Sequence, residues 1–249
     1  MTDMLDPFVH HPELRDRIAC SESSFFRDFN LDDLIKQRPE MEQFRHWAHT
    51  DAERDAIRAK ALANHTGDLW IFAYGSLMWD PALRFQEVRR VFAPGYARKL
   101  ILKDDKGGRG SPEAPGLMGG LDNGDGCEGL VYRIAEHEID TEMEILFRRE
   151  MIAPGYQPTF IPVHIEGSVM QVLTFVADHA SPDMLPEISR TDQVRWIATG
   201  VGFLGSSRDY LVNIVEQLTH LGIDDPACTD LLREVDDYIS CTQFNEANL

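Results

Sequence analysis

Residues 69–76, LWIFAYGS, form a short apolar and aromatic run that ends in a Gly-Ser step. A run of this length closed by turn residues is typical of a buried β-strand. The chain before it differs, since segment 40–64 contains no Gly or Pro and repeats apolar residues at helical spacing. We therefore expect a domain boundary near residue 67, with a helical N-terminal extension at 1–66 and the main domain at 67–249.

The N-terminal extension is expected to consist of helices. Segment 40–64 is rich in Ala, Glu, Arg and Gln, which favour helix, and its apolar positions line one face. We predict one amphipathic helix there and a shorter helix within 12–29. Three aromatic residues in that shorter segment are interpreted as anchors onto another surface: Phe25, Phe26 and Phe29.

Beyond residue 67 the predicted strands and helices do not alternate regularly. Strands are predicted at 88–92, 96–103, 127–134, 159–166 and 169–176, with a tight hairpin turn at 166–168. Helices are predicted at 136–151, 182–198, 208–221 and 225–239. This order favours an α+β sheet or barrel with helices packed around it over a doubly wound parallel sheet.

Residues 104–126 contain eight glycines and two prolines, and we predict an irregular loop there. A loop of this length inside a compact domain is usually functional or disordered. Arg109 and Glu113 are its candidate functional residues.

Net charge excludes several classes of protein. The chain has 42 acidic and 24 basic residues and a formal net charge of −18. A nucleic-acid binder needs a basic face, and an anionic membrane surface would repel this chain.

The longest strongly apolar stretch, 172–177, is too short to span a bilayer. The N-terminus lacks a signal peptide pattern, so we expect a soluble cytoplasmic protein. The four cysteines lack the CxxC spacing of a zinc or redox site, and we expect no disulfides.

The segment Tyr74-Gly75-Ser76-Leu77 directly follows the first predicted strand. A glycine at a strand end lets backbone N–H groups turn outward into a small concavity that binds anions, such as a substrate carboxylate. A simple strand-ending turn is the alternative for so short a motif. These residues alone leave both interpretations open.

Glu150 ends the predicted helix at 136–151. The negative end of a helix dipole and partial desolvation would raise the pKa of its carboxyl toward the range of a general base. Arg148 and Arg149 would oppose this shift if they approach it. The alternative is a solvated surface carboxylate. Glu144 lies about 120° away around the helix, so the two do not form a carboxylate pair.

Six blocks of sequence, taken in order, resemble the ChaC-type gamma-glutamylcyclotransferase family. They are FAYGSLMW at 72–79, RGSPEAPG at 109–116, CEGLVYRI at 127–134, ILFRRE at 145–150, PGY at 154–156 and GSSRDYL at 205–211. The resemblance implies an α+β fold built on a small mixed β-barrel with surrounding helices. It implies a cytosolic lyase that cleaves a small-molecule substrate, glutathione, into 5-oxoproline and cysteinylglycine without a metal or organic cofactor.

The resemblance also implies roles for individual residues. Glu150 is expected to be the general acid/base. The γ-glutamyl group is expected to bind at Tyr74, Gly75, Ser76, Leu77 and Met78. Arg109 and Tyr156 are further candidate substrate contacts. Because glutathione is an anion, we expect the surroundings of residues 74–78 to be electropositive within an acidic protein.

Three departures from the family pattern put the substrate in doubt: Ala73 where glycine is common, a glycine-rich stretch after Gly116, and the long N-terminal extension. One alternative is a cyclotransferase for other γ-glutamyl amino acids or γ-glutamylamines. Another is a non-catalytic binding protein on the same fold.

Overall fold

The computed structural model describes residues 6–246. One compact unit contains the chain up to Arg98 together with Leu121–Asp178. A second compact unit contains Lys99–Gly120 and the chain from His179 onward. The boundary predicted near residue 67 lies inside the first unit and stays a prediction. Among residues 6–246, no helix is both long and apolar enough to cross a membrane.

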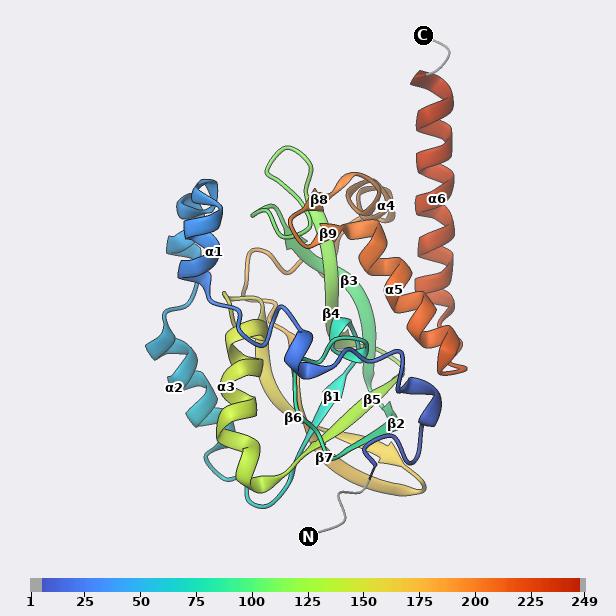
Figure 1. The fold of residues 1–249 in the computed structure, drawn as a ribbon. Coiled ribbons are helices and arrows are strands. Elements are labelled where there is room, and N and C mark those ends of the chain that lie inside the picture. Colours follow the sequence, from blue (N-terminus) through green and yellow to red (C-terminus); the bar gives the residue numbers. More distant parts are fainter. Residues whose placement is uncertain (1–5, 247–249) are drawn as a thin grey trace. The chain divides into compact units, whose positions relative to one another are not determined.

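A five-stranded barrel forms the centre of the first unit (Figure 1). Its strands, in spatial order, are β1 (Leu69–Ala73), β5 (Cys127–Ile134), β2 (Glu87–Ala93), β6 (Tyr156–Ile165) and β7 (Ser168–Ala177). Neighbouring strands are antiparallel, and a parallel pair between β1 and β7 at Ile71 and Leu173 closes the barrel. The predicted α+β fold with a small mixed barrel is therefore confirmed, and the predicted strands are correct to within a few residues.

The barrel core is made of alternating strand residues, as expected for strands with one buried face. Phe72, Val131, Ile161 and Val172 belong to one buried cluster. Each such side chain contributes roughly 1.5–3 kcal/mol on burial. Gly129 has a special role, because a methyl group there would collide with the backbone carbonyl of Ala73. The glycine thus lets β5 approach the end of β1, where the Tyr-Gly-Ser-Leu segment begins.

The hairpin between β6 and β7 turns at Glu166 and Gly167, both with positive φ (47° and 80°). Two such residues in a two-residue connection are typical of the tight turns that match strand twist. The predicted hairpin is confirmed. Helix α3 (Ile139–Glu150) follows a short 3-10 turn, η5 (Glu136–Glu138), and its Phe147 packs edge-on against Phe175 of β7, with ring centroids 5.3 Å apart.

The helical extension differs from the prediction in its segmentation. Its elements are η1 (Pro12–Leu14), η2 (Ser21–Ser23), α1 (Leu31–Gln37), η3 (Pro39–Trp47) and α2 (Asp51–Leu62). The single helix predicted at 40–64 is wrong, because Thr50 and Glu53 form a capping box that starts a new helix after a break. The helix predicted within 12–29 is also wrong, since only two 3-10 turns form there.

The extension packs on the rest of the first unit. Helix α2 lies beside α3 (Figure 1), and Arg58 of α2 donates to the Asp140 carbonyl of α3 at 3.0 Å. The backbone N–H of Ala19 donates to the carbonyl of Trp79 at 2.8 Å. Of the three predicted aromatic anchors, Phe29 is buried, whereas Phe25 is 51% exposed.

The second unit contains α4 (Arg190–Thr199), a small hairpin of β8 (Val201–Gly202) and β9 (Gly205–Ser206), α5 (Ser207–His220) and α6 (Pro226–Glu246). Strands β3 (Tyr96–Asp104) and β4 (Gly116–Asn123) each have residues in both units. The prediction of a continuous loop at 104–126 is wrong, because β4 forms within it. A glycine of β4 allows close packing on α5, since a methyl group at Gly119 would lie 2.8 Å from the Tyr210 hydroxyl.

Candidate active site

The Tyr-Gly-Ser-Leu segment leaves β1 and enters a single 3-10 turn, η4 (Ser76–Met78). Two buried phenols hold it. Tyr74 donates its hydroxyl to the Phe175 carbonyl at 2.9 Å, and Tyr132 of β5 donates to the Leu77 carbonyl at 2.9 Å. Burial raises the pKa of Tyr132, so its hydroxyl stays a neutral donor. The turn is therefore fixed from the barrel side, by its own Tyr74 side chain on the backbone of β7 and by the Tyr132 side chain of β5.

Arg149 connects this turn to the end of α3. Its Nη2 donates to Ser76 Oγ at 2.9 Å, its Nη1 donates to the carbonyl of Asp80, and its Nε lies 3.0 Å from Glu150 Oε1. The arginine side chain is 4% exposed. A planar guanidinium with several donors suits such a bridge, because it contacts three acceptors in one plane. Ser76, Arg149 and Glu150 are thereby brought into one cluster.

Glu150 is the last residue of α3, and its side chain is 15% exposed. Burial raises the pKa of its carboxyl, and the neighbouring Arg149 opposes that rise. The upward direction predicted from the sequence is confirmed, with burial as its main cause. A carboxyl with a raised pKa that keeps some solvent access is better suited to accept and release a proton in turn than an ordinary surface glutamate.

A second buried arginine lies behind the turn. Arg98 is 4% exposed, donates to the carbonyl of Tyr74, and contacts the carbonyl of Glu128 through Nη2 at 2.6 Å. Two guanidinium groups, Arg98 and Arg149, therefore flank residues 74–78. Asp80 carries the opposite charge, and its Oδ1 is buried without a hydrogen-bond partner among the described residues.

Sequence reasoning did not identify Arg149, Arg98, Tyr132 or Asp80 as site residues. Arg149 had a local signal, because it directly precedes Glu150. Tyr132 had none, since it lies 55 positions from Leu77 and meets it only through the barrel.

The remaining predicted site residues lie elsewhere. Tyr156 begins β6 opposite Ala177 and is partly buried. Arg109 lies in the second unit, where Nη1 donates to the Ser206 carbonyl at 3.1 Å and the guanidinium stacks on Tyr210. Their roles toward a substrate stay predictions. Glu113 accepts from Ser111 at 3.0 Å in an exposed position. Glu144 is exposed, as expected, and lies 3.5 Å from Arg148.

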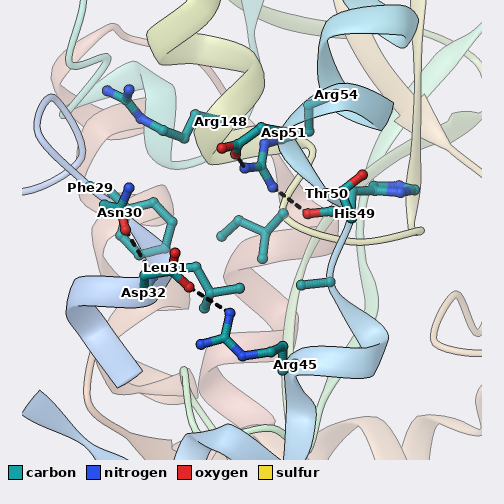
Figure 2. A pocket seen from close by; sticks show the side chains of 12 residues that line it. Phe29, Asn30, Leu31, Asp32, Arg45, His49, Thr50, Asp51, Arg54 and Arg148 are labelled. Atoms are coloured by element: carbon teal, nitrogen blue, oxygen red, sulfur yellow. Dashed lines mark hydrogen bonds and ion pairs between the residues drawn. The ribbon is translucent and has the colours of Figure 1, made fainter. Parts of the chain in front are cut away.

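A cavity of about 220 Å³ lies in the first unit between the extension and the end of α3 (Figure 2). Two of its arginines are paired within its own wall: Arg45 with Asp32 at 2.5 Å, and Arg54 with Asp51. Arg54 also donates to the His49 carbonyl at 2.6 Å, as Figure 2 shows. None of the candidate site residues lines this cavity. Within residues 6–246, no group of three His, Cys, Asp or Glu side chains is placed to hold a metal ion.

Residues 69–238 match the sequence model of the family described as ChaC-like protein, which covers well over half of the chain. The chain belongs to the ChaC-like family. The matched part contains the turn at residues 74–78, Arg149 and Glu150, whereas the helical extension precedes it.

Curated relatives of this ChaC-like protein carry gamma-glutamylcyclotransferase names. The glutathione-specific gamma-glutamylcyclotransferase of Escherichia coli K12 is 34% identical over 186 residues, covering 74% of this chain and 80% of its own. Gamma-glutamylcyclotransferase 2-3 of Arabidopsis thaliana is 30% identical, covering 67% and 88%. A crystal structure of the yeast gamma-glutamyl cyclotransferase specific to glutathione shares the fold, with a TM-score of 0.64 and 20% identity over 70% of this chain and 97% of that one.

Proposed function

We propose that this ChaC-like protein is an enzyme, a glutathione-specific gamma-glutamylcyclotransferase that releases 5-oxoproline and cysteinylglycine. The observation that carries the proposal is the cluster at the end of α3, where Arg149 joins the mostly buried Glu150 carboxyl to Ser76 of the turn. The names of the curated relatives support glutathione as the substrate. We assign the reaction to the cytoplasm, as the family resemblance implies.

The reaction needs positioning and proton transfer rather than a protein nucleophile. The α-amine of the γ-glutamyl group attacks its own γ-carbonyl, so one C–N bond forms and closes a five-membered lactam. The amide bond to cysteine then breaks. In our proposal Glu150 takes a proton from the attacking amine and returns it to the departing nitrogen, so one carboxyl performs both transfers. Holding the flexible glutamyl chain in the attack geometry supplies much of the remaining acceleration.

In the proposed mechanism, the turn at residues 74–78 binds the γ-glutamyl group. The first N–H groups of a helical turn have no acceptor inside that turn. In η4 they would bind the substrate carboxylate or stabilise the oxyanion that forms at the γ-carbonyl. The nearby charges of Arg98 and Arg149 make this region favourable for an anion in a protein of net charge −18. Arg109 and Tyr156 stay candidate contacts for the rest of the substrate.

The substrate class can be tested directly. Purified protein is incubated separately with glutathione, γ-glutamylalanine and γ-glutamyl-lysine, and 5-oxoproline is measured. We expect product from glutathione and little from the other two. Product mainly from γ-glutamylalanine or γ-glutamyl-lysine would keep the chemistry and replace the substrate. No product from any of the three would favour a binding protein on this fold.

A further inference from the structure

A short segment of the N-terminal extension lies against the arginine of the candidate active site. The Cζ atom of Arg149 lies 4.0 Å from the centroid of the Phe26 ring. Phe26 is supported by two aromatic neighbours, since its centroid lies 5.3 Å from that of Phe25 and 6.4 Å from that of Phe29. The guanidinium of Arg149 therefore has an aromatic face on one side and three acceptors around its edge.

A buried ion pair fixes the position of this segment. Arg27 contacts the Glu142 carboxylate of α3 through both terminal nitrogens, at 2.8 and 2.9 Å, and also donates to the Ala82 carbonyl at 2.9 Å. The carbonyl of Arg27 accepts from Arg148 Nη2 at 2.7 Å. Side-chain exposure is 9% for Arg27 and 1% for Glu142. The backbone next to Phe26 is thus attached both to α3 and to the chain that follows the turn at residues 74–78.

We propose that Phe26 is a positioning residue of the active site, which holds the Arg149 guanidinium in the plane that reaches Glu150 and Ser76. Stacking on an aromatic face and donating in the plane are compatible for arginine, because the two use different parts of the group. The family model begins at residue 69, so this contact comes from outside the matched part. The inference rests on the proposed role of Glu150.

The contact has an electrostatic consequence for Glu150. Arg149, Arg98, Asp80 and Tyr132 are the charged and titratable groups described around this cluster and its turn. Of these, Arg149 lowers the pKa of Glu150, against the effect of burial. Without the Phe26 ring, water reaches the face of the guanidinium and its orientation is less restricted, so its influence on Glu150 weakens. The pKa of Glu150 then rises further, and the acidic limb of the activity profile moves to higher pH.

Phe26→Leu tests this inference, because leucine keeps an apolar side chain and removes the aromatic face. We expect kcat for 5-oxoproline release from glutathione to fall about three- to thirtyfold, the usual range for such a contact. The acidic limb should move to higher pH, and KM should change little because Tyr74 and Tyr132 still hold the turn. Phe26→Tyr and Phe26→Trp, which keep the aromatic face, should restore most of kcat. Phe92→Leu, at a phenylalanine of β2 that is 37% exposed, is the matched control and should behave like wild type.

Two results would overturn the positioning role while leaving the proposed function intact. One is a Phe26→Leu enzyme with the kcat and pH profile of wild type. The other is a set of Phe26 variants that all lose kcat and melting temperature to the same extent while the acidic limb of the pH profile does not move. That result would indicate that Phe26 serves structural packing only. A wild-type protein that releases no 5-oxoproline from any γ-glutamyl compound would overturn the function, and this inference with it.

Discussion

Replacing Glu142 with glutamine should destabilise the first unit strongly, although the side chain keeps its size. The carboxylate accepts two hydrogen bonds from Arg27 and one from the Arg84 backbone N–H at 3.0 Å. A glutamine keeps one acceptor oxygen and places an NH₂ group against the guanidinium. The Arg27 charge then stays buried without a counter-charge, which typically costs about 3–5 kcal/mol. For a domain of this size each kcal/mol lowers the melting temperature by about 2–4 °C, so we expect a decrease of about 6–20 °C.

The measurement is thermal and urea unfolding followed by far-UV circular dichroism. Asp32→Asn is the matched control, because it also removes one carboxylate charge from an arginine pair of the extension. In that pair the side chains of Arg45 and Asp32 are 46% and 63% exposed. Exposed pairs contribute about 0–1 kcal/mol. If Glu142→Gln lowers the free energy of unfolding no more than Asp32→Asn, the extension is not held to α3 by this ion pair.

Three further predictions concern the site. The base must be ionised to act, and burial raises the pKa of Glu150, so the acidic limb of the kcat–pH profile should have an apparent pKa above the ordinary pKa of a glutamate carboxyl. An apparent pKa at or below that ordinary value would contradict this. A raised carboxyl pKa means that the native state binds the proton more tightly than the unfolded state, so wild type loses stability as pH rises through that window. The melting temperature of Glu150→Gln should therefore increase relative to that of wild type as the pH rises from acidic to neutral. A difference in melting temperature that does not change with pH would refute the raised pKa of Glu150. Tyr132→Phe removes the donor to the buried Leu77 carbonyl, so it should lower the free energy of unfolding by about 1–3 kcal/mol and raise KM for glutathione. The control Tyr238→Phe, at an exposed position, should change neither quantity.

Local sequence patterns predicted those parts of the fold that local forces determine. The apolar run before Tyr74 gave a buried strand, and the Glu-Gly step gave the hairpin with two positive φ values. Strand β4 was missed because its glycines, which usually weaken strands, are needed where Tyr210 packs closely. The break before α2 was missed because an unbroken helical periodicity conceals the Thr50 capping box.

The candidate site was predicted only in part, for a similar reason. Glu150 and the turn each lie within a contiguous sequence motif, so sequence blocks revealed them. The link between them depends on which nitrogen of Arg149 faces which acceptor, and that follows from packing. Arg27 and Glu142 lie 115 positions apart, and neither has a neighbour that indicates a buried ion pair. Long-range contacts of this kind have no local periodicity to detect.

Proton transfer by Glu150 is tested most directly by the initial rate of 5-oxoproline release from glutathione. The comparison is between wild type, Glu150→Gln and Glu144→Gln, the last being an exposed glutamate of the same helix. Loss of a general acid/base typically costs about 10²–10⁴-fold. We predict a loss of that size for Glu150→Gln and the wild-type rate for Glu144→Gln. A Glu150→Gln protein that turns over glutathione like wild type would contradict the assignment of Glu150.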